Sequence, residues 1–397
     1  MQISKNNKKP VNLRSKSQNR QQKSQKKSSL NPALLVQQAV INTTVTKSRV
    51  ETRFEDMNLV SSLKNNILQL GYAHPTEIQD KTFSTLVDGS NLIGIAATGT
   101  GKTGAFLIPM IEKLLRNKDQ KFQTLIMVPT RELALQVYDE FKKLAKNTQL
   151  TAMSFIGGTN VDADVRKLRN NCDFIIGTPG RLLDLNNRGS LKLNQFDVLI
   201  LDEFDKMLDM GFIHDIRQIT SKMNRRKQTL LFSATKDSKQ KSIIDEIVQN
   251  PFIVEIQSEN KSSKNVQQDI IKVNQGQEKF SMLLDLLSEV GFDKVILFTE
   301  TKHLANRLSK RLNESGITSD QIHGNKSQNY RVNALDKFKK GIIRVLVATD
   351  VAARGIDIND VSLVVNYQVP NDFETYIHRV GRTGRAGKTG TAYTFVD

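Results

Sequence analysis

Short, continuous apolar runs alternate with helical stretches along this chain, and the alternation occurs twice. Apolar residues at helical spacing fill the intervals, as over residues 132–146, 303–312 and 331–340. Strands that are apolar throughout and separated by helices are typical of parallel sheets with helices on both faces. The pattern therefore predicts two α/β domains. The apolar runs are residues 125–128, 174–176, 198–201 and 229–232 in the first half, and 295–298, 345–348, 363–366 and 392–396 in the second.

The length of 397 residues also favours two domains, because it exceeds what one hydrophobic core usually supports. Between the two halves lies a polar stretch without periodicity, residues 257–265, which is typical of a flexible linker. After the last predicted strand no further domain is expected. We expect an N-terminal extension over 1–50, a first domain over 51–256, a linker over 257–267 and a second domain over 268–397.

The N-terminal extension concentrates positive charge. Of the formal net charge of +17, residues 1–50 supply +11 and contain no Asp or Glu, which leaves +6 on the other 347 residues. Such a Lys-, Ser-, Gln- and Asn-rich segment buries too little apolar surface to fold, so we expect it to be disordered. One interpretation is an arm that binds polyanions without sequence preference. A solubilising tail is the alternative, and a transit peptide is disfavoured because the segment is rich in Lys rather than Arg.

Composition excludes several classes of protein. The chain has no run of about 18 apolar residues, so we expect no membrane span. Cys172 is the only cysteine, which excludes an intrachain disulfide and suits a reducing, cytoplasmic location. The five histidines lack metal-ligand spacing, so zinc is not expected. Nothing indicates an oligomer, and we expect a monomer.

Residues 96–103, Ala-Ala-Thr-Gly-Thr-Gly-Lys-Thr, have the pattern of a phosphate-binding loop between a strand at 91–95 and a helix from Gly104. Glycines let backbone N–H groups approach the phosphates of a nucleoside triphosphate, and the helix N-terminus favours negative charge. Lys102 would reach the β- and γ-phosphates, and Thr103 would ligate Mg²⁺. Ala96 stands where the motif usually has its first glycine. The predicted nucleotide-binding residues of the loop are Thr98, Gly99, Thr100, Gly101, Lys102 and Thr103.

An apolar strand, residues 198–201, ends in the sequence Asp202-Glu203-Phe204-Asp205. Carboxylates at the carboxyl edge of a parallel sheet lie where ligands bind in doubly wound folds. Asp202 would hold Mg²⁺ through water, and Glu203 would orient and deprotonate the attacking water. The alternative is acidic capping of the following helix.

Residues 378–385, His-Arg-Val-Gly-Arg-Thr-Gly-Arg, form a second cluster of cations without acidic neighbours. A remote set of cations able to reach the γ-phosphate would make hydrolysis depend on two bodies closing together. The alternative is a basic surface loop.

With these motifs in this order, the chain resembles the DEAD-box ATP-dependent RNA helicases of helicase superfamily 2. The resemblance extends from about residue 54 to the end and implies two tandem RecA-like domains, each a mostly parallel sheet flanked by helices, after a disordered basic tail. Further matching segments are Phe54 with residues 71–79, and residues 129–133, 157–158, 178–181, 233–235, 328–331 and 348–357.

The resemblance assigns roles around the nucleotide, residue by residue. Gln79 would recognise the adenine edge and Phe54 would stack near the base, which implies ATP; alternatively Gln79 closes a helix start. Asp357 would contact the ribose. Arg382 and Arg385 would act as arginine fingers on the γ-phosphate.

Coupling between the ATP site and the RNA face is implied for a second group of residues. Ser233 and Thr235 would hydrogen-bond to the acidic motif, including Asp205, and the alternative for both is ordinary turn chemistry. His378 and Arg379 would bridge the two domains.

The RNA face implied by the resemblance consists of hydroxyls, glycines, an amide and arginines. These groups suit phosphates and 2′-OH groups rather than base edges, so we expect RNA binding without sequence specificity. The alternative for any one of them is a helix cap or a loop. The residues are Thr130, Arg131, Gly157, Gly158, Thr178 and Arg181 in the first domain, and Thr301, Gln328, Arg331 and Thr349 in the second.

Phe204 departs from the family, which has Ala at this position. By the alternation of side chains at a strand end it would face away from the metal and pack against apolar neighbours. The complete catalytic set, Lys102, Asp202, Glu203, Arg382 and Arg385, favours an ATP-driven helicase that opens short RNA duplexes locally. An ATP-gated RNA clamp is the second hypothesis, and a DNA translocase, disfavoured by Gln79 and the RNA-type threonines, is the third.

Overall fold

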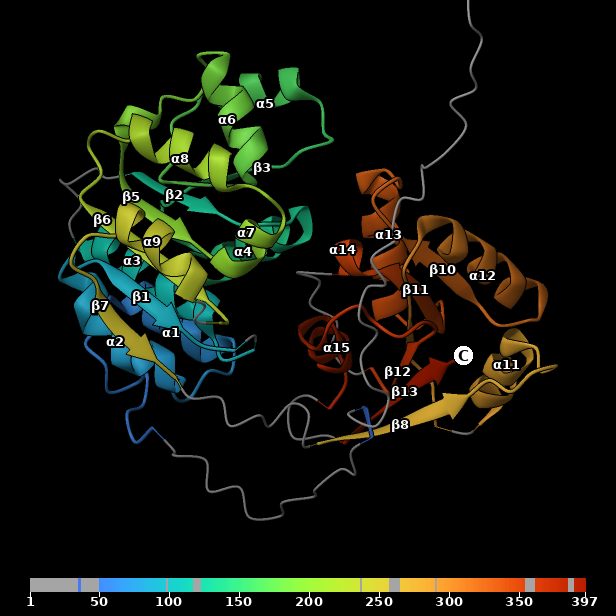
Figure 1. Cartoon of the computed structure of the whole chain (residues 1–397). Helices are drawn as coiled ribbons and strands as arrows, with labels where there is room; N and C mark the ends of the chain where they lie inside the picture. Colours follow the sequence, from blue (N-terminus) through green and yellow to red (C-terminus); the bar gives the residue numbers. More distant parts are fainter. Residues whose placement is uncertain are drawn as a thin grey trace, which may run out of the picture.

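The computed structural model describes residues 35–36, 50–97, 99–116, 123–235, 238–256, 265–289, 291–353, 361–384 and 389–397. Figure 1 shows two α/β lobes that face each other. Residues 50–256 form the first, called lobe 1, and residues 265–397 form the second, called lobe 2. The predicted fold class of two tandem parallel α/β domains is confirmed.

Lobe 1 is built on a parallel sheet with the strand order β3-β4-β2-β5-β6-β1-β7. Its central strands β5 and β6 are buried along their whole length, as expected for strands covered on both faces. The strands are β1 Leu92–Ile95, β2 Gln123–Met127, β3 Ala152–Phe155, β4 Phe174–Gly177, β5 Phe196–Leu201, β6 Gln228–Ser233 and β7 Phe252–Glu255.

Two apolar clusters cover the two faces of this sheet. One contains apolar residues of α1 to α4 and the other those of α6 to α9. The helices are α1 Ser61–Gln69, α2 Glu77–Val87, α3 Lys102–Arg116, α4 Arg131–Leu144, α5 Val161–Lys167, α6 Pro179–Asn187, α7 Phe204–Asp209, α8 Ile213–Lys222 and α9 Ser238–Ile247, with a 3₁₀ turn, η2, over Leu193–Gln195.

Lobe 2 repeats the design with the parallel strand order β10-β11-β9-β12-β13-β8. One face carries α13, α14 and α15, and the other carries α11 and α12. The strands are β8 Val266–Lys272, β9 Val295–Thr299, β10 Ser319–Ile322, β11 Val345–Thr349, β12 Leu363–Asn366 and β13 Gly390–Val396. The helices are α11 Lys279–Ser288, α12 Lys302–Glu314, α13 Gln328–Lys339, α14 Asp350–Ala353 and α15 Phe373–Val380.

All eight predicted apolar strands are present, with ends shifted by a few residues at most. Four described strands were not predicted: β3, β7, β8 and β10. These are the outermost strands of the two sheets, and exposed or half-buried positions interrupt their apolar pattern. The continuous-run criterion recognises only strands that are buried on both faces, so it misses sheet edges.

The predicted boundaries meet the structure at two points. The linker was expected to extend to residue 267, whereas β8 begins at Val266. Most of the predicted disordered extension, residues 1–50, lies outside the described residues, except Leu35, Val36 and Val50. No helix in the described ranges is both long enough and apolar enough to cross a bilayer.

Candidate nucleotide and nucleic-acid site

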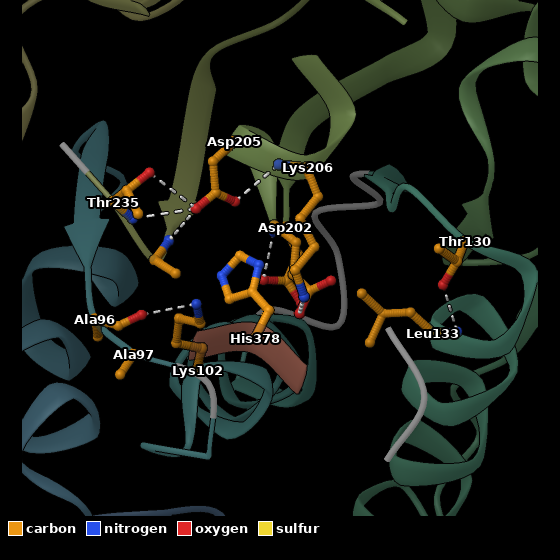
Figure 2. A network of polar contacts seen from close by, with 12 residues as sticks. Ala96, Ala97, Lys102, Thr130, Leu133, Asp202, Asp205, Lys206, Thr235 and His378 are labelled. Atoms are coloured by element: carbon orange, nitrogen blue, oxygen red, sulfur yellow. Dashed lines mark hydrogen bonds and ion pairs between the residues drawn. The ribbon is translucent and has the colours of Figure 1, made fainter. Parts of the chain in front are cut away.

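The predicted phosphate loop lies between β1 and α3, at the carboxyl edge of the lobe 1 sheet. Gly99 and Gly101 have positive φ angles of 84° and 92°, which L side chains rarely adopt. Lys102 is 6% exposed, and its Nζ donates to the carbonyl oxygen of Ala96 at 2.8 Å (Figure 2). Thr100 and Thr103 flank it, whereas Thr98 lies outside the described residues. The loop therefore places its lysine where phosphates would bind.

Gln79 contacts this loop directly. Its Nε2 donates to the carbonyl oxygen of Gly101 at 3.0 Å, and its Oε1 accepts from the backbone N–H of Thr76 at 2.9 Å, which also caps α2. Phe54 is 1% exposed and lines a small depression together with Gln79 and Pro75. Each polar atom of Gln79 keeps one further bonding capacity, so adenine recognition by Gln79, and stacking by Phe54, stay predictions.

Asp202 follows β5 and is 2% exposed. Burial raises the pKa of its carboxyl to about 6, while the nearby charge of Lys102 acts in the opposite direction. Its Oδ1 accepts from the backbone N–H of Glu203 at 2.9 Å. Only β6 separates the strand that carries this carboxylate from the strand that leads into the phosphate loop, and a cation bound beside the carboxylate would lower its pKa.

Glu203 has a left-handed backbone, with φ 52° and ψ 50°, a conformation that costs non-glycine residues free energy. Its Oε1 accepts from Lys206 Nζ at 2.7 Å, and both side chains are buried. Its Oε2 is also buried and has no hydrogen-bond partner within the described structure. The strained backbone therefore presents one free carboxylate oxygen, which fits a group that orients water.

The residues predicted to hold Mg²⁺ fit that ion. Oxygen ligands suit it, and the buried carboxylate of Asp202 and the unpaired carboxylate oxygen of Glu203 lie next to each other in the chain. Asp202 and the hydroxyl of Thr103 would hold the ion, which when bound would neutralise charge on the phosphates.

Asp205 joins the acidic motif to residues 233–235, as predicted. Its Oδ2 accepts from the backbone N–H groups of Ala234 and Thr235 at 2.9 and 3.1 Å, and from Thr235 Oγ1 at 3.3 Å (Figure 2). Ser233 was also expected to bond to this motif, and that prediction is wrong. Its Oγ donates instead to the carbonyl oxygen of Thr235 at 2.9 Å, because Ser233 is fully buried at the end of β6 and closes the turn that follows.

Phe204 packs as predicted for a side chain that faces away from the phosphates. It is fully buried, and it belongs to the same apolar cluster as Met207 and Ile216. The hydrogen bonds of Asp205 to Ala234 and Thr235 form beside it. The bulky residue therefore leaves this coupling intact.

Lobe 2 presents the end of α15 to this site. Figure 2 shows His378 in the same polar network as Lys102 and Asp202. Arg382 Nε donates to the carbonyl oxygen of His378 at 3.3 Å, and its charge lowers the pKa of Lys206, after the larger effect of burial. The charge of Arg382 in lobe 2 thus acts on Lys206, the partner of Glu203 in lobe 1. Asp357 and Arg385 lie outside the described residues.

Arg379 was expected to bridge the domains, and the structure contradicts this. It is 2% exposed, and its Nε and Nη2 donate to the carboxylate of Asp350 at 2.6 and 2.8 Å, while Nη1 donates to Asn366 Oδ1 at 3.1 Å. All these partners belong to lobe 2. Consecutive helical residues point about 100° apart, so when His378 faces lobe 1 its neighbour faces inward.

The predicted RNA-face hydroxyls lie at helix starts. Thr130 Oγ1 accepts from Leu133 N at 3.2 Å as the cap of α4, and Thr301 Oγ1 accepts from Leu304 N at 3.2 Å as the cap of α12. Thr178 occupies the cap position of α6 without a cap bond, and Thr349 ends β11. The alternative of helix capping therefore applies to Thr130 and Thr301.

Arg131 lies against the Gly157–Gly158 turn. A Cβ atom at Gly158 would lie 2.4 Å from Arg131 Nη1, so any other residue would displace the guanidinium, and the φ angle of 79° also favours glycine. Burial and then the charge of Arg331 lower the pKa of Arg131. Cationic groups of both lobes therefore gather around this turn, which favours an anionic ligand.

Arg181 was expected on the RNA face, but its guanidinium turns inward. It is 9% exposed, forms a buried ion pair with Asp164, and donates to Thr159 Oγ1 at 3.0 Å and the Thr159 carbonyl oxygen at 2.8 Å. A buried arginine requires a paired carboxylate, and Asp164 at the start of α5 provides it. Arg181 thus supports the residue that follows the glycine turn.

Gln328 and Arg331 of α13 meet Glu132 of α4 across the lobes. Glu132 Oε1 accepts from Gln328 Nε2 and from Arg331 Nη2, both at 3.0 Å. Arg131 Nη1 donates to Gln328 Oε1 at 3.4 Å. Residues expected to grip RNA therefore also hold the two lobes together.

Sequence reasoning missed three charged residues of this site. Glu132 lies inside the quoted segment 129–133, and an acid beside Arg131 was the available signal. Lys206 follows Glu203 at a spacing of three, which places the two on one helix face. Asp350, in the segment 348–357, is the half-buried partner of the buried Arg379 and had no signal of its own.

A phosphate loop, an acidic strand end and a basic helix end from the opposite lobe define a two-lobed nucleoside triphosphatase. The first lobe matches the DEAD/DEAH box helicase family over residues 76–243, and the second matches the helicase conserved C-terminal domain over residues 278–387. The chain belongs to the DEAD-box family of ATP-dependent RNA helicases.

Individual relatives agree with this membership. The chain is 43% identical over 345 residues to the ATP-dependent RNA helicase CshA of Listeria monocytogenes, covering 87% of this chain and 66% of that protein. It is 41% identical over 354 residues to the ATP-dependent RNA helicase RhlB of Pseudomonas syringae, covering 87% and 89%. The structure of S. cerevisiae Dbp5 bound to RNA and ADP BeF3 superposes with a TM-score of 0.76 at 31% identity, covering 87% and 89%.

Proposed function

We propose that this chain is an RNA-dependent ATPase that uses closure of its two lobes to bind RNA without sequence specificity and to open short duplexes or remodel RNA–protein complexes. The observation that carries the proposal is the contact of Gln328 and Arg331 of lobe 2 with Glu132 of lobe 1, in a structure where the charge of Arg382 also acts on Lys206 beside Glu203. The ATP side and the RNA side thus close together.

The order of events follows from these contacts. ATP would bind on the phosphate loop of lobe 1, and closure would bring Arg382 to the γ-phosphate. Glu203 would hold the attacking water on its unpaired Oε2 and accept its proton. Release of phosphate would remove the anion that Arg382 faces, and the lobes would separate.

An ATP-gated clamp would need closure but not turnover. The complete set of Lys102, Asp202 and Glu203, with one carboxylate oxygen of Glu203 held free, favours hydrolysis. The ATP-gated clamp is therefore the second candidate function, and RNA clamping is a step of the helicase cycle rather than its result.

The decisive measurement is the rate of ATP hydrolysis by the full chain with no nucleic acid, with single-stranded RNA, and with DNA of the same sequence. We expect RNA to raise the rate and DNA to leave it near the basal value. A short RNA duplex should be opened only when ATP is present. Equal stimulation by DNA and RNA would contradict RNA recognition, and a rate without nucleic acid as high as the rate with RNA would contradict coupling.

The proposal includes Mg²⁺ as the ion at Asp202 and Thr103, a monomeric state and a cytoplasmic location. Cys172 is buried, and burial raises the pKa of its thiol to about 12, so the thiol is unreactive. A free, unreactive thiol is compatible with a reducing compartment. Removal of the divalent ion by a chelator should abolish hydrolysis.

A further inference from the structure

Leu35, which belongs by sequence to the basic extension, is buried in lobe 2. Its side chain is 0% exposed, and it belongs to an apolar cluster that includes Val266 of β8 and Tyr376 and Val380 of α15. The next side chain, Val36, is 49% exposed. One apolar residue of the extension is therefore embedded in the second lobe while its neighbour faces solvent.

A buried hydrogen bond fixes the backbone at this point. The carbonyl oxygen of Leu35, at 3.2 Å, and Gln268 Oε1, at 2.9 Å, share the single proton of the Tyr376 hydroxyl as acceptors. Burial raises the pKa of Tyr376, so its hydroxyl stays a donor at neutral pH. Tyr376 and Gln268 are themselves 1% and 3% exposed. Leu35 thus satisfies both apolar and polar groups of lobe 2.

The noncovalent contact of Leu35, together with the chain that leads from it to lobe 1, gives the two lobes a second connection besides the linker. Figure 1 shows the short blue segment of residues 35–36 beside β8 of lobe 2, apart from the blue start of lobe 1. Residues 36 and 50 are 14 positions apart, a length of chain that reaches at most about 48 Å when extended. That reach allows the lobes to separate while the anchor stays in place.

We infer that Leu35 anchors the N-terminal extension to lobe 2, so that the nine Lys and Arg residues of 1–34 are held beside lobe 2 and add RNA-backbone contacts next to the clamp. No Asp or Glu occurs among residues 1–34, so the anchored segment offers only cationic groups to a phosphate backbone. A tail attached at Leu35 as well as at residue 50 samples a smaller volume than one attached only at residue 50, so its cationic groups have a higher local concentration near lobe 2. The role on RNA rests on the proposed function, whereas the anchor itself does not.

The anchor is tested by a distance measurement in the full chain without RNA. Nitroxide labels would replace Ala33 and Lys272, with Cys172 left in place because it is buried. The variants are Leu35→Asp and the matched control Val36→Asp, which adds the same charge one residue away at an exposed position. We expect a narrow distance distribution in the parent and in Val36→Asp, and a broad one in Leu35→Asp. Equal distributions in all three proteins would overturn the anchor.

A second variant, Tyr376→Phe, is needed because the carboxylate introduced by Leu35→Asp could disrupt lobe 2 itself. It removes only the hydroxyl that bonds Leu35 and Gln268, so the fold should persist while the distribution broadens partly. A distribution as narrow as that of the parent would show that this hydrogen bond does not hold Leu35.

The role on RNA is tested by the affinity for single-stranded RNA at low salt. We expect Leu35→Asp to weaken binding about 3- to 10-fold, towards the value of a chain that lacks residues 1–34, and Val36→Asp to change it less than twofold. Equal affinities of the two variants would overturn the RNA role. A parent that fails to bind RNA would instead refute the proposed function, and the label distances would still decide the anchor.

Discussion

The contact between Glu132 and α13 makes a quantitative prediction about lobe closure. Glu132 Oε1 accepts from Gln328 and from Arg331, and the side chains of Glu132 and Arg331 are 7% and 12% exposed, so solvent screens the pair weakly. Hydrogen bonds to charged groups contribute about 1.5–3 kcal/mol. Glu132→Gln keeps an oxygen acceptor but removes the charge. We expect it to destabilise closure by about 2 kcal/mol, which is about 30-fold in the equilibrium.

Closure can be followed by energy transfer between dyes on the two lobes, for instance at Lys81 and Lys310, whose side chains are exposed. The measurement would use a non-hydrolysable ATP analogue and saturating single-stranded RNA. The RNA-stimulated ATPase rate at low RNA concentration should fall in parallel, while basal ATP binding should not change.

Asp139→Asn provides the matched control on the same helix. Its partner is Lys142, and both side chains are more than half exposed, so the pair contributes about 0–1 kcal/mol. A double-mutant cycle between Glu132→Gln and Arg331→Met isolates the interlobe interaction. Additive effects of the two changes, or closure unaltered by Glu132→Gln, would refute the assignment of this contact to the closed state.

Three further outcomes follow from the buried charges. Glu203→Gln should retain ATP-dependent RNA binding but lose about 10²- to 10⁴-fold in phosphate release, and release at the parent rate would show that Glu203 is misassigned. Asp202→Asn should stabilise the free protein at pH 7.5 by up to about 3 kcal/mol, because the pKa of Asp202 in the folded protein, about 6, lies above its value in the unfolded chain. Urea unfolding should show this gain in stability fading as the pH falls from 6 to 4, and a gain independent of pH would contradict the raised pKa. Arg379→Met should destabilise lobe 2 by about 1–3 kcal/mol because it removes charged hydrogen bonds to Asp350, whose carboxylate is 27% exposed and stays partly solvated. An unchanged unfolding transition together with lost hydrolysis would instead support a bridging role for Arg379.

The parts of the fold that were predicted are those whose sequence pattern has one physical cause. β5 and β12 are buried along their whole length because helices cover both their faces, and the apolar runs within them were recognised. β7 carries Phe252 and Ile253, which are 50% and 56% exposed, next to buried Val254, and such a short strand has no distinctive pattern. Its pairing with β1 depends on a partner about 160 residues away, which no local pattern encodes.

The direction of a charged side chain was the least predictable feature of the site. His378 and Arg379 are adjacent and belong to the same motif, yet only the histidine reaches the network with Lys102. Arg131 and Arg181 both follow a threonine within a quoted motif, yet Arg131 faces Gln328 and Arg181 faces Asp164. The deciding factor is which acceptor the fold places within reach, Gln328, Asp164 or Asp350, and that partner lies elsewhere in the sequence.

For the threonines of the RNA face, the two interpretations of the sequence are compatible. The cap bonds of Thr130 and Thr301 use the hydroxyl oxygen as an acceptor of a backbone N–H. A hydroxyl has one donor besides its acceptor sites, and a phosphate oxygen requires a donor. Capping therefore leaves the hydroxyl proton available, and it fixes the rotamer that aims it. The cap hydrogen bond holds the threonine side chain in place before any nucleic acid binds. RNA binding therefore requires little additional ordering of these side chains.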